Sequence, residues 1–259
     1  MYSDSERNAG TPAKTGALRA QSGILSPAYW REAAKQLTVP RMLVFAALIT
    51  ALRVAVKMFK VPIATGVSLS FDCYVNSLGS MVYGPVVALL VGAVSDTVGY
   101  LLFPSGAYFL PFILVEMTSS FLFALFLWRR EITAPRVLAA KFSVNLVCNI
   151  FMTSLFMKWS YYVFSGAGAA QAYSIFNLVR VAKSLVLFPL EAVLIVTVLS
   201  AFLPALRRLR IVPADQRNIK PEPKHIVFFS LLTLFSVALI VFYVVYLRGF
   251  LASHNVKLF

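Results

Sequence analysis

Four basic side chains lie inside two segments that are otherwise apolar, and their spacing pairs them. Arg53 and Lys57 are four residues apart, and Arg180 and Lys183 are three apart. Residues at these spacings share one face of a helix. A guanidinium or ammonium group on such a face can bind the carboxylate of a ligand. We therefore expect these four side chains to hold the anionic part of a small molecule.

Three carboxylates, Asp72, Asp96 and Glu116, stand in neighbouring apolar segments. Charges inside a membrane helix are costly, so they usually face a bundle interior or a water-filled cavity. Counted with the four cations, the set has one surplus positive charge, which favours an anionic ligand. The alternative is that these groups pair with one another and only pin helices together. We expect Asp96 and Glu116 to accept hydrogen bonds from ligand donors.

Amides and aromatic rings offer further contacts to a ligand. Asn145 and Asn149 are one helical turn apart, and such amides either join helices or bind a polar ligand. Tyr108, Phe109 and Trp159 lie at predicted loops, where they form an interfacial aromatic belt or stack on a flat heterocycle.

The composition excludes a water-soluble monomer. Of 259 residues, 59% are apolar and 13% are charged, and the mean hydropathy is +0.79. Soluble domains carry about twice this share of charge. Two distant cysteines, Cys73 and Cys148, predict neither a disulfide nor a metal site. The sequence has no phosphate-binding loop or hydrolase motif, so we expect no cofactor and no enzymatic activity.

The hydropathy pattern predicts an all-α integral membrane bundle of six transmembrane helices with a seventh helix near the C-terminus. Proline and glycine breaks separate the predicted helices, which are 41–59, 72–83, 85–103, 109–128, 137–158, 174–203 and 226–247. The predicted domains are a disordered cytoplasmic tail (1–40), the six-helix domain (41–203), a basic cytoplasmic linker (204–225) and the seventh helix with a short tail (226–259).

Basic residues predict the orientation in the membrane. They concentrate in the N-terminal tail, in the connection 129–136 and in the linker 204–225, whereas loops 104–108 and 159–173 carry no charge. The positive-inside rule then places the N-terminus in the cytoplasm of a multi-pass cell-membrane protein. Topology therefore accounts for the net charge of +14 without nucleic-acid binding. Arg53 lies about 18 Å along its helix, so the charged set falls in the outer half of the membrane.

Three segments resemble the substrate-binding S components of energy-coupling factor (ECF) vitamin transporters of the folate type. The most specific is residues 92–109, GAVSDTVGYLLFPSGAYF, which is similar to the family pattern GAxxDxxGxxLFPxGxYF. The second is residues 144–149, VNLVCN, and the third runs from Arg180 to Glu191. The resemblance covers about residues 41–203.

This resemblance implies a subunit that captures a small anionic vitamin from outside, with folate as the first expectation. It implies three partner subunits, namely a coupling transmembrane subunit and two ATPases, within a lipid bilayer. Ser105 and Gly106, in a gating loop, join the expected substrate contacts. Ala47, Ala51 and Ala55 form a small-residue stripe that lets another helix approach closely, and the resemblance implies that this stripe docks on the coupling subunit.

Three other functions stay open at this point. Glu116 departs from the folate-type pattern, so the cargo could be another vitamin or heterocycle, such as pantothenate or a queuine-like base. A solitary ion-coupled secondary transporter would show inverted repeats, and the sequence has none. A membrane enzyme acting on lipid could use Asp96 and Glu116 as acid and base, but no metal or paired-carboxylate motif accompanies them.

Overall fold

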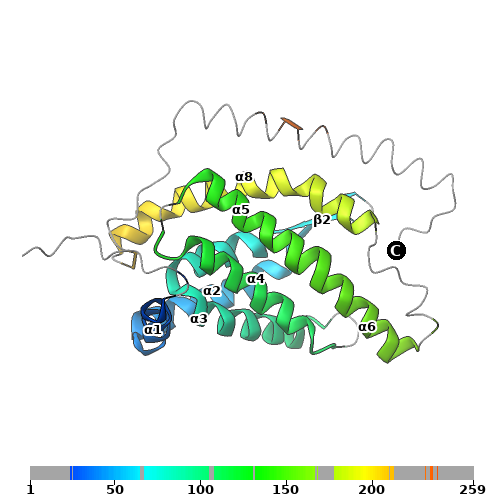
Figure 1. Cartoon of the computed structure of the whole chain (residues 1–259), viewed down its shortest axis with the longest axis horizontal. Coiled ribbons are helices and arrows are strands. Elements are labelled where there is room, and N and C mark those ends of the chain that lie inside the picture. Colours follow the sequence, from blue (N-terminus) through cyan, green and yellow to red (C-terminus); the bar gives the residue numbers. More distant parts are fainter. Residues whose placement is uncertain are drawn as a thin grey trace, which may run out of the picture.

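The computed structural model describes residues 24, 26–64, 67–104, 108–130, 132–166, 168, 178–209 and 211–212, together with residues 231, 234, 235 and 238. These residues form a helical bundle with one small β-hairpin (Figure 1). Most of the predicted seventh helix lies outside this part of the chain.

The elements follow one another in a simple order. They are α1 (Pro27–Lys35), η1 (Gln36–Thr38), α2 (Pro40–Lys57), β1 (Lys60–Ala64), β2 (Val67–Ser70), α3 (Asp72–Leu102), α4 (Phe112–Leu127), α5 (Ala134–Val144), η2 (Asn145–Met152), α6 (Thr153–Ser165) and α8 (Leu178–Arg208). Figure 1 shows α5, η2 and α6 as one long diagonal rod, with α8 on one side of it and α2 to α4 on the other. A core of apolar side chains fills the space between α3, α4, α5 and α8, and includes Phe123, Leu127, Val137 and Leu199.

By length and composition alone, three helices could cross a membrane: Asp72–Leu102, which contains a break at Gly84, Ala134–Ser165 and Leu187–Arg208. A fourth span results if the segments Pro27–Thr38 and Pro40–Lys57, which are bent by 80°, count as one. Helix α4 is apolar but shorter. The described residues therefore form a helical membrane bundle, and the count of six or seven spanning helices stays a prediction.

Helix α3 consists of two arms that fold back on each other at Gly84. This residue has φ 81° and ψ 175°, which is outside helical geometry. Asp72 contacts Arg53, and Asp96 contacts Lys57 one turn further along α2. A straight helix would separate the two aspartates by about 36 Å. The chain therefore reverses where the Gly84-Pro85 pair predicts a break.

Close packing at this reversal also requires glycine. A Cβ at Gly84 would lie 2.7 Å from the ring of Trp128, and the positive φ disfavours other residues. Tyr29 also packs edge-on against Trp128, at 5.0 Å between ring centroids, and Ala33 joins the same apolar cluster. Helix α1 thus covers the end of the bundle at which α3 reverses.

The prediction of a disordered tail to residue 40 is wrong for α1. Ser26 caps the helix by accepting a hydrogen bond from the Ala28 amide, and Pro27 occupies its first turn. Tyr29 and Ala33, four residues apart, supply the buried face. Only one turn of this short helix shows apolar spacing. The composition of the whole segment is polar, so composition alone does not predict a packed helix there.

The segment between the predicted helices 41–59 and 72–83 contains the β-hairpin, which departs from the predicted all-helical fold. Strands β1 and β2 pair antiparallel, with Val61 opposite Leu69 and an irregularity between Pro62 and Ala64. Apolar and polar residues alternate in the second strand, Val67-Ser-Leu-Ser70, which is the period of a strand.

Two helix ends also differ from the predicted ones. The rod that contains α6 continues to Ser165 and ends at Gly166, whose φ is 86°, so Trp159 lies on a helix rather than in a loop. Helix α8 continues through Pro204 to Arg208. Proline is tolerated in membrane helices because neighbouring groups can satisfy the freed carbonyl.

Candidate functional site

Arg53 is the centre of a buried ion-pair network. Its Nε and Nη2 donate to the two carboxylate oxygens of Asp72, each at 2.9 Å. Nη2 also donates to Glu116 Oε2 at 2.7 Å, and Nη1 donates to Ser120 Oγ at 3.1 Å. The Arg53 side chain has no exposed surface. It therefore joins α2, α3 and α4 with every guanidinium nitrogen engaged.

Lys57 extends this network toward the surface of the bundle. Its Nζ lies 3.4 Å from Asp96 Oδ1 and 3.8 Å from Glu116 Oε1. These three side chains are 20–28% exposed, in contrast to Arg53. Glu116 therefore bridges a sealed part of the network and an accessible part. The accessible part can exchange hydrogen bonds with a ligand, whereas Arg53 is sealed from the surface of the bundle.

Within the described part of the chain, the network holds three carboxylates and two cations. The predicted surplus positive charge depends on Arg180 and Lys183. Both lie in α8, but the structure does not describe their side chains. The five described side chains pair with one another in the structure, which is the alternative that the sequence analysis left open. Ser105 and Gly106 also lie outside the described residues.

Local sequence explains how these groups meet. Arg53 and Lys57 are one turn apart on α2, and Asp72 is the first residue of α3. The second arm of α3 then approaches α4 closely, because a Cβ at Gly92 would lie 2.8 Å from the carbonyl oxygen of Glu116. Glycine at this position lets the two helix backbones touch, which brings the Glu116 side chain to the network.

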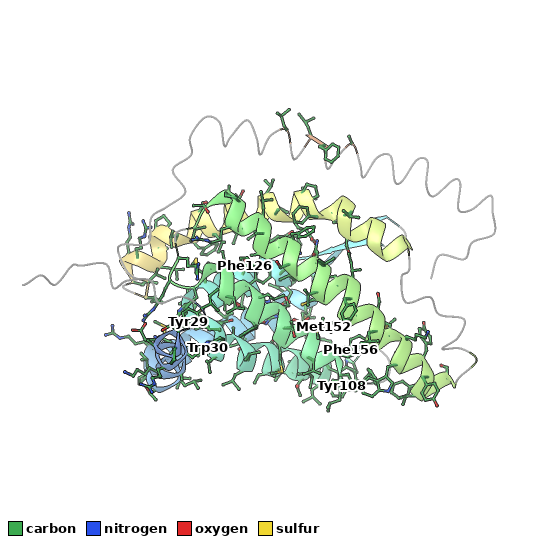
Figure 2. All side chains as sticks on the ribbon, in the orientation of Figure 1. Tyr29, Trp30, Tyr108, Phe126, Met152 and Phe156 are labelled. Atoms are coloured by element: carbon green, nitrogen blue, oxygen red, sulfur yellow. The ribbon has the colours of Figure 1, made fainter. Side chains whose placement is uncertain are left out.

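An aromatic cluster lies at the end of the bundle opposite α1, and Figure 2 shows Tyr108 and Phe156 there. Phe109 contacts Trp159 edge-on, at 5.4 Å between ring centroids, and Phe156 lies 6.4 Å from Trp159. Tyr108 packs on Tyr100 at 4.5 Å. The structure thus brings Phe109 and Trp159 together, as the sequence analysis expected, whereas Tyr108 packs on Tyr100 instead. Trp159 is 51% exposed, so its ring is available for stacking.

The two amides act mainly within the bundle. Asn145 Nδ2 donates to the Ser184 carbonyl of α8 at 3.2 Å, and Asn149 Nδ2 donates to Asn145 Oδ1 at 2.9 Å. Both lie in η2, a π-helical segment of the rod. Asn145 is buried and Asn149 is exposed, so Asn149 is the one placed to meet a ligand.

The sequence analysis missed a second buried ion pair. Lys141 Nζ lies 2.8 Å from Glu191 Oε2, with side chains 3% and 13% exposed, and joins α5 to α8. A signal was present, because Lys141, Asn145 and Asn149 repeat every four residues. All three therefore share a helix face, and the first two of them contact α8.

Small polar residues of α3 and α4 were missed as well. Asn76 Nδ2 donates to Ser119 Oγ at 3.3 Å, and Ser80 Oγ donates to Asn76 Oδ1 at the same distance. The adjacent residue, Ser120, accepts the hydrogen bond from Arg53 Nη1. These contacts bind the first arm of α3 to α4 beneath the ion pairs.

No group of three or more potential metal ligands occurs among the residues that the structure describes. On the outside of the bundle, Ala47, Ala51 and Ala55 are all exposed on α2. Large apolar neighbours on this helix are exposed too, including Val44 (71%) and Leu48 (64%). A smooth, apolar helix face is thus open to lipid or to another membrane helix.

Residues 38–210 match the family model described as "ECF-type riboflavin transporter, S component". The chain belongs to this family. It is a family of transporter components rather than of enzymes, and with its apolar helices the chain is a multi-pass membrane protein. The S-component resemblance seen in the sequence is confirmed.

Similar proteins carry folate in their names. The S component is 26% identical to the folate transporter FolT of Clostridium novyi (strain NT) over 129 residues, which are 50% of this chain and 70% of that protein. It is 28% identical to FolT of Leuconostoc mesenteroides over 153 residues, 58% of this chain and 80% of that one. A crystal structure of FolT bound with folic acid matches with a TM-score of 0.50 and 28% identity, covering 60% of this chain and 88% of that chain.

Proposed function

We propose that this S component captures a folate from outside the cell and delivers it to an ECF-type importer. The observation that carries the proposal is the likeness to FolT bound with folic acid, which extends over 88% of that chain. The family match, residues 38–210, includes α2 to α8, the helices that carry the charged network and the aromatic cluster.

The accessible edge of the network suits a pterin-like ring. Carboxylates accept hydrogen bonds from adjacent N–H donors, and Asp96 and Glu116 are the exposed carboxylates beside Lys57. The rings of Tyr108, Phe109 and Trp159 would stack on or cover the heterocycle. Arg180 and Lys183 would bind the carboxylates of the ligand. Arg53 then acts as a positioning residue that holds Glu116 from behind.

The proposal includes partners. The exposed stripe of Ala47, Ala51 and Ala55 would dock on a coupling transmembrane subunit, which two ATPases would drive. Small side chains allow close approach of a partner helix, and the exposed apolar neighbours on α2 would be buried with them. The N-terminus would lie in the cytoplasm, since α1 and the basic residues share one end of the bundle.

Mass spectrometry of the small molecule that co-purifies with the detergent-solubilised chain tests the cargo. A folate is the expected result, and folic acid should raise the midpoint of thermal unfolding. Riboflavin is the second candidate, because the family description names it. A thermal shift with riboflavin and none with folic acid would overturn the folate assignment while leaving the S-component assignment in place.

A further inference from the structure

Lys57 holds its two carboxylates more loosely than Arg53 holds its own. The Lys57 Nζ atom lies 3.4 Å from Asp96 Oδ1 and 3.8 Å from Glu116 Oε1. Arg53, in contrast, donates to carboxylate oxygens at 2.7–2.9 Å, which is the usual length of a hydrogen bond between charged groups. The ammonium of Lys57 thus lies between two carboxylates without a short bond to either.

Lys57 also has room to leave this position. It is the last residue of α2, and its side chain is 22% exposed. Its stem lies over Gly99 of α3, where an added Cβ would be 3.4 Å from Lys57 Cδ and 3.9 Å from Nζ. Glycine offers no side chain that would hold the stem, and a lysine stem is flexible. Arg53 differs, because its side chain is completely buried.

Lys57 has no further acidic residue to move to on the outer side of the bundle. The sequence segments 58–71, 103–115 and 159–173, which the predicted topology places toward the outside, contain no Asp or Glu. An ammonium that leaves the network would therefore enter water or meet an anionic group of the ligand.

We propose that Lys57 is an exchangeable counterion that determines which ligands bind. Without a ligand, its ammonium takes the place of ligand N–H donors between Asp96 and Glu116. A ring with adjacent N–H donors displaces it, because such donors can make short hydrogen bonds to both carboxylates. A long, partly exposed ion pair contributes little free energy, so ligand binding can drive the exchange. Rings without adjacent N–H donors leave Lys57 in place and are excluded. The inference rests on the proposed function, which assigns ring recognition to these two carboxylates.

The test compares Lys57→Met and Lys57→Arg with the unmodified full-length chain, purified in detergent. The probes are folic acid and pterin, which carries the ring donors but no carboxylate, and calorimetry measures both affinities. Lys158→Met is the matched control, because it removes a cation from α6 beside the aromatic cluster, outside the network. Circular dichroism checks that each variant is folded.

Lys57→Met is expected to bind pterin about fivefold more tightly than the unmodified chain, because the competing ammonium is gone. Lys57→Arg is expected to bind pterin about fivefold more weakly, because a guanidinium matches carboxylates better than an ammonium does. Methylammonium ions, which can take the place of the missing ammonium, should weaken pterin binding to Lys57→Met and leave binding to Lys158→Met unchanged.

Weaker binding of pterin by Lys57→Met would show that Lys57 contacts the ligand, and would overturn the inference. Equal affinities of the unmodified chain and both Lys57 variants would show a purely structural ion pair, and would overturn it as well. In these two outcomes the folate assignment stands. If the unmodified chain bound neither pterin nor folic acid, the proposed function would fall together with the inference.

Discussion

Replacing Arg53 with methionine should destabilise the bundle as a whole rather than simply weaken ligand binding. The substitution removes four hydrogen bonds at 2.7–3.1 Å, three of them to carboxylates. Asp72, with only 14% of its side chain exposed, would then lose its nearest cation. Removing one partner of a buried ion pair costs about 3–5 kcal/mol. We expect a loss of stability in that range for Arg53→Met.

Equilibrium unfolding in mixed micelles, driven by sodium dodecyl sulfate and followed by circular dichroism, measures this loss. The double variant Arg53→Met with Asp72→Asn should recover most of it, because the stranded negative charge is removed as well. Lys57→Met is the matched control. Its ion pairs are longer and about a fifth exposed, so its removal should cost about 1 kcal/mol or less. If Arg53→Met were as stable as the unmodified chain but bound folic acid weakly, Arg53 would be a ligand contact and the argument would fail.

Three further predictions concern the site, the fold and the partner surface. Glu116→Gln should weaken folic acid binding about tenfold in calorimetry, because an amide cannot replace both carboxylate acceptors; unchanged affinity would remove Glu116 from the site. Gly84→Ala should cost about 2 kcal/mol or more in the same unfolding assay, from positive φ and the clash with Trp128. Gly166→Ala, which shares the positive φ but has open space, should cost only about 1 kcal/mol, and equal costs would exclude the clash. Ala51→Leu should keep the folic acid thermal shift but reduce co-purification with the coupling subunits, and undiminished co-purification would contradict docking on α2.

The sequence predicted helix boundaries best where the length of an apolar run agreed with a proline or glycine break. Gly84-Pro85 marked the reversal of α3, since only glycine adopts its positive φ easily and proline starts a helix well. The i, i+4 spacing of Arg53 and Lys57 correctly placed both on one face. The convergence of Asp96 and Glu116 with them followed from counting depth along helices.

Pairing partners could not be predicted in the same way. Which carboxylate meets Arg53 depends on helix rotation and on close contacts such as that between Gly92 and Glu116, neither of which one sequence reveals. Lys141 escaped notice because a lysine near a helix start reads as an interfacial residue. Its carboxylate partner Glu191 lies fifty residues away on another helix. Helix α1 was missed because its burial depends on Trp128, a contact across about a hundred residues.

The reversal at Gly84 has a consequence for how the protein is made. The first arm of α3 has twelve residues and is about 18 Å long, which is too short to cross a hydrocarbon layer of about 30 Å alone. It also begins with Asp72, whose charge Arg53 of α2 compensates. We therefore expect this arm to enter the membrane together with the second arm, as a helical hairpin, and after α2 is present. A substitution at Arg53 or Gly84 would then act during synthesis, before any vitamin is bound.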